Sequence, residues 1–160
     1  MKPRTKARSI ALQALYEIDL TDHATGVVIE HLFLETPLKN ENLEDFARKI
    51  VLGVEPLREE LDQFISEHAP EWPIDQVSTI DRNLLRIALW EFAVSGETPI
   101  KVAINEAIEL AKRYGADSTP RFVNGVLGSL AARQNEIRQS LATRLNKDQT
   151  DSEQNQEESD

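Results

Sequence analysis

Residues 99–130, PIKVAINEAIELAKRYGADSTPRFVNGVLGSL, carry the clearest indication of the fold. Its pattern predicts two helices joined by a short polar turn. Thr98 can cap the first helix, and Pro99 suits its first position. Apolar side chains then recur at helical spacing on one face, at Ile104, Ala107, Ile108 and Ala111. Gly115 is expected in the left-handed position that ends many helices.

The second helix of this stretch is expected to have Thr119 as its N-cap and Pro120 in its first helical position. Its apolar face is formed by Phe122, Val123, Val126, Leu127 and Leu130. Gly125 and Gly128 carry no side chain, so we expect another backbone to approach the helix there.

Similar patterns predict helices in the rest of the chain. One helix is predicted over residues 3–20, a short one ends before Pro37, and a third begins after Asn40 or Asn42. This third helix is expected to kink or break at Gly53 and Pro56.

A loop is predicted around Trp72, and the capping box Ser78–Asp81 opens a helix that runs to about Val94. This helix is apolar most of the way round, which is typical of the central helix of a domain. No alternating apolar pattern typical of strands is found. The sequence therefore predicts an all-α bundle of about seven helices.

Charge is distributed unevenly along this chain of net charge −10. Residues 1–8 hold four basic groups and no acid, residues 9–100 are strongly acidic, and residues 101–145 are again slightly basic. Residues 146–160 are acidic and contain no apolar side chain, so we expect a folded domain over 1–145 and a disordered tail over 146–160. A local basic surface on an acidic protein suits a polyanion.

Catalytic and metal sites are not indicated by the sequence. Cysteine is absent, and the three histidines, His23, His31 and His68, do not form a metal-binding motif. Phosphate-binding loops are also missing. We therefore expect no catalytic residues, no metal and no cofactor. Without a long apolar segment, the protein is expected to be soluble and cytoplasmic.

Nucleic-acid binding has more support from the residues. The N-terminal arm carries Lys2, Arg4, Lys6 and Arg8, and the later turn brings Lys112, Arg113, Arg121 and Phe122 into one neighbourhood. Backbone N–H groups at a helix N-terminus suit a phosphate, and Phe122 or Tyr114 could stack on an unpaired base. Phe122 could instead pack in the core. The N-terminal arm could instead serve only to keep the protein soluble.

Four segments together resemble the NusB family of transcription antitermination factors. They are ARSIALQALYEIDL (7–20), DRNLLRIALWEF (81–92), PIKVAINEAIELAKRYG (99–115) and FVNGVLGSLA (122–131). The resemblance covers about residues 1–133. It implies an all-helical fold of two packed sub-bundles and no enzymatic activity.

The resemblance also implies partners and sites. It implies binding of single-stranded boxA RNA together with the ribosomal protein NusE, and assembly with RNA polymerase and other Nus factors to suppress premature termination, chiefly in ribosomal RNA operons. The RNA-contacting positions would be Lys2, Arg4, Lys6 and Arg8, with Arg121 and Phe122. The NusE-contacting positions would be Asp75, Asp81 and Arg82. The alternative is a helical protein–protein adaptor that does not bind RNA.

Overall fold

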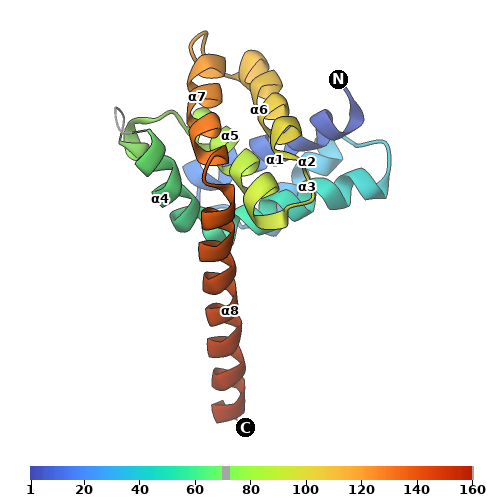
Figure 1. Ribbon diagram of the computed structural model, residues 1–160. Helices are drawn as coiled ribbons and strands as arrows, with labels where there is room; N and C mark the ends of the chain where they lie inside the picture. The colour runs from blue at the N-terminus through green and yellow to red at the C-terminus, as the bar shows by residue number, and fades with distance from the viewer. Residues whose placement is uncertain (70–72, 160) are drawn as a thin grey trace.

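The computed structural model describes residues 1–69 and 73–159, and this part of the chain is entirely helical (Figure 1). The α-helices are α1 (Pro3–Leu20), α2 (Thr25–Glu35), α3 (Glu41–Val54), α4 (Arg58–His68), α5 (Thr79–Leu89), α6 (Ile100–Tyr114), α7 (Thr119–Ala131) and α8 (Gln134–Ser159). Two short 3₁₀ helices, η1 (Glu55–Leu57) and η2 (Ile74–Gln76), and one π-helix, η3 (Trp90–Ser95), complete the chain. The predicted all-α class is confirmed, while the loop expected around Trp72 lies outside the described residues.

The helices form two groups that α5 joins. α1 packs on α2 and α3, whereas α4, α5, α6 and α7 pack on one another. α5 also contacts α1 and α3, and its side chains Leu84, Leu85 and Leu89 are fully buried. The central position predicted for this helix is confirmed, because apolar residues on all its sides meet a neighbour.

Local signals placed several helix ends correctly. The Asn40 Oδ1 accepts a hydrogen bond from the Leu43 N–H at 3.0 Å, and the Ser78 Oγ accepts one from the Asp81 N–H at 3.1 Å. The predicted break between α3 and α4 occurs at η1, which contains Pro56. Gly53 lies just before it, where an added Cβ would overlap the ring of Trp90.

The stretch 99–130 forms the predicted helices, but several of its end signals serve other purposes. Pro99 is the N-cap of α6, and the Thr98 hydroxyl instead donates to Glu91. Gly115 has φ −90° and is not left-handed; its missing side chain leaves room for Thr119, since an added Cβ would lie 2.6 Å from the Thr119 Cβ. The prediction that a backbone approaches Gly125 and Gly128 is wrong, because both face open space.

The sequence predicts a disordered tail over residues 146–160, and in the structure residues 146–159 continue α8. α8 runs without interruption from Gln134 to Ser159 and projects away from the body of the molecule (Figure 1). Its first turns are anchored by Ile137 and Leu141, which are buried, whereas Leu145 is already exposed. The continuation past residue 146 therefore extends from a packed base, and its described side chains are exposed to solvent.

Candidate nucleic-acid and partner interfaces

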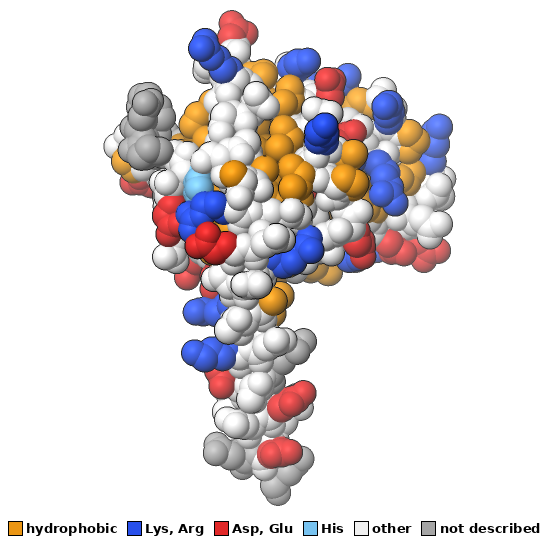
Figure 2. Space-filling view, viewed as in Figure 1, with side chains coloured by type: hydrophobic (Ala, Val, Ile, Leu, Met, Phe, Trp, Pro, Cys, Tyr) orange, Lys and Arg blue, Asp and Glu red, His pale blue; other side chains and the backbone are white. Residues whose placement is uncertain are grey.

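A basic surface surrounds the N-terminal end of α1. One shallow pocket there is lined by Lys2, Lys112 and Arg113, among others, and a second is lined by Lys6, Lys39 and Arg113. Because Arg113 lines both pockets, the five cations form one continuous surface, which we call the basic surface. Figure 2 shows Lys and Arg side chains gathered over the end of the body where the N-terminus and α6 lie. Lys39 comes from the loop before α3 and was not predicted, because only the fold brings this loop to the arm.

Arg4 lies on a different side of α1 and remains exposed. Its guanidinium carbon is 4.8 Å from the centroid of the Phe46 ring on α3, and that of Arg8 is 5.0 Å from the same ring. Cation–π contacts of this kind contribute about 0.5–1 kcal/mol at exposed sites. Phe46 therefore orients Arg4 without burying its charge.

Arg8 is not available to RNA, which corrects the sequence-based prediction. Its side chain is 3% exposed and lies against Glu91 of η3. The Arg8 Nε donates to both carboxylate oxygens of Glu91 at 3.0 Å, and Nη2 donates to Oε1 at 2.7 Å. Glu106 approaches Arg8 Nη1 at 3.6 Å, so the charge is fully paired inside the protein.

The same buried network fixes the first turns of α1. The Thr5 hydroxyl donates to Glu106 at 2.7 Å, and the Thr98 hydroxyl donates to Glu91 at 3.0 Å. Glu106 thus contacts both Thr5 and Arg8 of α1. Because Thr5 and Arg8 face inward, the helical period turns Lys2, Arg4 and Lys6 outward.

Phe122 and Arg121 open α7. Arg121 is exposed, whereas Phe122 is partly buried and packs against the core. Phe122 also lines a separate groove with Gln76, Val77, Ser78, Asp81 and Ser118, and it lines neither pocket of the basic surface. Phe122 therefore lines a different pocket from Lys112, with which it was predicted to act.

The three predicted partner-contacting residues lie at or just before the start of α5. Asp75 is exposed on η2. Asp81 lines the groove of Phe122, and its Oδ1 accepts a hydrogen bond from Thr119 at 2.9 Å. Arg82 donates through Nη2 to the Thr79 hydroxyl at 3.2 Å, while its buried Nε has no hydrogen-bond partner. Asp81 is thus both a link to α7 and part of an open surface.

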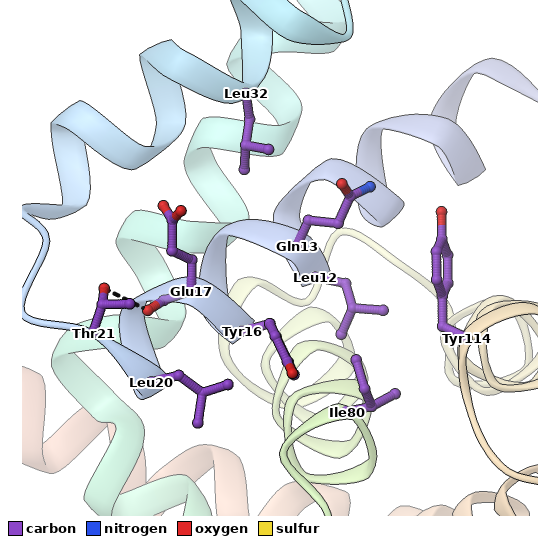
Figure 3. A pocket seen from close by; sticks show the side chains of 9 residues that line it. All are labelled: Leu12, Gln13, Tyr16, Glu17, Leu20, Thr21, Leu32, Ile80 and Tyr114. Atoms are coloured by element: carbon purple, nitrogen blue, oxygen red, sulfur yellow. Dashed lines mark hydrogen bonds between the residues drawn. The ribbon is translucent and has the colours of Figure 1, made fainter.

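An apolar groove that reaches the start of α5 through Ile80 was not predicted from the sequence. It has a volume of about 380 Å³ and is lined by Leu12, Gln13, Tyr16, Glu17, Leu20, Thr21, Leu32, Ile80 and Tyr114. Figure 3 shows Leu12, Tyr16 and Ile80 at its centre, with Tyr114 at one edge. Tyr16 is 41% exposed and Leu20 is 55% exposed. One signal in the sequence could have indicated it: Tyr16 and Leu20 are four residues apart, and neither belongs to the buried face of α1.

Within residues 1–69 and 73–159, no group of three His, Cys, Asp or Glu side chains could hold a metal ion. His68 instead contacts Ser129 and Arg133, with its Nδ1 2.6 Å from the Ser129 Oγ and its Nε2 3.0 Å from the Arg133 Nη1. The helices of this same part of the chain are too short or too polar to cross a membrane.

Comparisons with known proteins agree with this architecture. A curated relative, the transcription antitermination protein NusB of Chloroflexus aggregans, is 46% identical over 132 residues, which cover 81% of this chain and 87% of the relative. A crystal structure of the antitermination factors NusB and NusE in complex with double-stranded RNA matches with a TM-score of 0.74 and 27% identity, covering 88% of this chain and 98% of that one. The structure of T. maritima NusB matches with a TM-score of 0.72 and 31% identity, covering 87% and 92%. Since the model of the NusB family also matches residues 5–132, the chain belongs to the NusB family.

Proposed function

We propose that this protein is a transcription antitermination factor that binds RNA together with NusE. The observation that supports this most directly is the similarity, over 88% of the chain, to the NusB component of a solved complex with NusE and RNA. The protein would act in the cytoplasm with RNA polymerase and other Nus factors and would have no catalytic activity of its own. Its targets would be boxA-type sequences, chiefly in ribosomal RNA operons.

RNA would bind at the basic surface and the exposed Arg4. The net charge of −10 opposes binding of a polyanion at long range, so a local cluster of cations has to supply the attraction. Lys2, Lys6 and Lys112 provide predicted contacts, and Lys39 and Arg113 extend them. Contacts of this type give affinity that falls with salt and carries little sequence information by itself.

NusE would bind across the start of α5. The apolar groove of Tyr16 and Leu20 includes Ile80 of this helix end, and the groove of Phe122 includes the next residue, Asp81. Exposed aromatic and aliphatic side chains beside a few polar groups are typical of protein–protein contacts. Phe122 would then serve the partner surface, and RNA selectivity would come from the assembled pair.

Titration of labelled RNA with and without NusE tests this function. The strands are a boxA-type single strand, a scrambled strand of equal composition, and a duplex, since the solved complex contains double-stranded RNA. We expect the boxA-type strand to bind more tightly when NusE is present. Equal affinity for the scrambled strand would contradict sequence-specific binding, and equal affinity with and without NusE would contradict the joint site.

The second candidate function is an adaptor that binds NusE without RNA. The observation that favours it is that Arg8 is withdrawn into the protein and that Glu106 and Glu109 line the same pocket as Lys112. Binding of NusE combined with no binding of any RNA at low salt would establish this alternative.

A further inference from the structure

The base of α8 is an integral part of the folded body, although the family match ends at residue 132. Ile137 is fully buried and Leu141 is 2% exposed. Two polar side chains on the same helix, Gln134 and Arg138, reach the π-helix η3. These four residues mark α8 as a docked element whose position is specified by more than apolar contact.

The docking point is the backbone carbonyl of Phe92 in η3. Gln134 Nε2 and Arg138 Nη2 each donate a hydrogen bond to this oxygen at 3.0 Å. The backbone N–H groups of Gly96 and Glu97 do not serve this carbonyl. The Gly96 N–H donates to the Glu91 carbonyl, and the Glu97 N–H donates to the Ser95 hydroxyl. A carbonyl at a helix end needs a partner, and α8 supplies two.

Gly96 makes room for this latch. Its φ of 66° is left-handed, and an added Cβ would lie 2.8 Å from the Arg138 Nη2. A glycine at this position therefore satisfies both the turn that ends η3 and the approach of the Arg138 guanidinium. We call Gln134, Arg138 and the Phe92 carbonyl the α8 latch.

The residue next to Phe92 in η3 is Glu91, which holds Arg8 of α1 through three short hydrogen bonds. Arg8 in turn lies over Phe46, whose ring also carries the exposed Arg4. One turn of η3 thus connects the base of α8 to the arm that presents Lys2, Arg4 and Lys6. Phe92, Glu91 and Arg8 are all buried, so this connection runs through the interior of the protein.

We propose that Gln134 and Arg138 are positioning residues for RNA binding, which act through η3 and the Arg8–Glu91 pair without touching RNA. The inference rests on the proposed RNA contact at the N-terminal end of α1. With the latch open, the end of η3 loses its fixed position, and Glu91 no longer holds the first turns of α1 in one orientation. RNA then has to order the arm as it binds, which weakens binding.

The experiment compares the double variant Gln134→Ala/Arg138→Ala with the matched control Gln139→Ala/Arg144→Ala. The control removes the same two residue types from the same helix, where Gln139 is exposed and Arg144 pairs with Glu60 at the surface. Hydrogen exchange of the backbone amides of residues 4–10 measures the order of the arm without RNA. Titrations with RNA at several salt concentrations and with NusE measure the two binding functions.

In the latch variant, we expect faster exchange over residues 4–10 and RNA binding weaker by about 3- to 30-fold, the range of energetic coupling between packed sites. The salt slope stays at the wild-type value because no phosphate contact is removed. Affinity for NusE also stays unchanged. The single variant Arg138→Lys, which keeps a donor for the Phe92 carbonyl, retains wild-type RNA binding. The control variant Gln139→Ala/Arg144→Ala also behaves as wild type.

Wild-type exchange and wild-type RNA affinity in the latch variant would overturn the proposal. So would a parallel loss of RNA binding, NusE binding and thermal stability, which indicates a purely structural role. If the double variant does not fold, Gln134→Ala alone is compared with Gln139→Ala by the same exchange measurement. If the wild-type protein binds no RNA, the proposed function fails, and unchanged exchange over residues 4–10 would still reject the coupling separately.

Discussion

The Thr119 hydroxyl donates a hydrogen bond to the Asp81 carboxylate at 2.9 Å, and this bond joins the first turn of α7 to the first turn of α5. The same hydroxyl oxygen accepts a hydrogen bond from the Ala116 N–H at 3.0 Å, so it also closes the turn between α6 and α7. Thr119 is 1% exposed. Thr119 was predicted to be the N-cap of α7, but the N-cap is Ser118. The Thr119 hydroxyl instead organises the edge of a proposed partner surface.

Replacing this hydroxyl tests the link. Thr119→Val keeps the shape of the side chain but leaves the Ala116 N–H without its partner, so we expect a loss of about 1–3 kcal/mol in the free energy of unfolding. Urea denaturation measures it. Thr119→Ser retains the hydroxyl and should lose less stability than the valine variant; a larger loss in the serine variant than in the valine variant would show that the methyl contact, not the hydrogen bonds, matters.

The Arg8–Glu91 pair makes a second prediction about stability. Arg8→Met leaves Glu91 buried without its cation, and we expect a loss of about 3–5 kcal/mol in the free energy of unfolding. Arg4→Met removes a neighbouring cation that is exposed, and it should cost less than about 1 kcal/mol. Denaturant unfolding of the two variants decides the matter. Similar small losses in both would place Arg8 among the surface cations, as its sequence position alone suggests.

The helix caps and the burial of Arg8 illustrate what the sequence could predict and what it could not. Ser78 and Asn40 cap helices three residues ahead of them, so the signal for each is contained in a short segment. The burial of Arg8 depends on Glu91, which is 83 residues away. The helical period places Arg8 on α1 but does not say which face meets another helix. The sequence therefore predicted a basic arm correctly and assigned one of its four cations to the wrong environment.

The apolar groove escaped prediction for a related reason. Its lining comes from α1, α2, α5 and α6, and it exists only once these helices have docked. Tyr16 and Leu20 are ordinary apolar residues in the sequence, and their exposure becomes visible only in the fold. Phe122 is the opposite case, because its spacing correctly indicated packing against the core, while the structure adds a groove beside it.

Salt dependence tests the cations proposed to contact RNA. For Lys2→Ala/Lys6→Ala, the slope of log affinity against log salt concentration should fall by about 0.7 for each lost contact to a single strand. Lys39→Ala and Arg113→Ala should each act in the same direction. Lys49→Ala is the control, since this lysine pairs with Glu97 and lines neither pocket. An unchanged slope in the double variant would remove the N-terminal arm from the RNA site.

The apolar groove makes a prediction for NusE that is independent of RNA. Tyr16→Ala and Leu20→Ala should each weaken NusE binding by about 1–3 kcal/mol, because both side chains are exposed in the free protein and would be buried by a partner. Calorimetric titration gives the affinity. Leu34→Ala is a suitable control, since Leu34 is 80% exposed on α2 and does not line the groove. If Leu34→Ala weakens binding as much as the groove variants do, the apolar groove is not the specific site of NusE binding.

Protonation of Glu136 should loosen the start of α8. The hydrogen bonds and the positive charge of Arg133 hold the pKa of the Glu136 carboxyl below its ordinary value. A carboxyl whose pKa is lowered by folding stabilises the folded protein above its unfolded-state pKa, and this stabilisation is lost as the pH falls through the lowered value. A carboxyl-detected NMR titration measures the pKa directly. In Arg133→Gln we expect the Glu136 pKa to return toward the ordinary value, and in Lys147→Gln, a change further along the same helix, to stay lowered. A Glu136 pKa that is unaffected by Arg133→Gln would show that this ion pair does not hold the junction of α7 and α8 in solution.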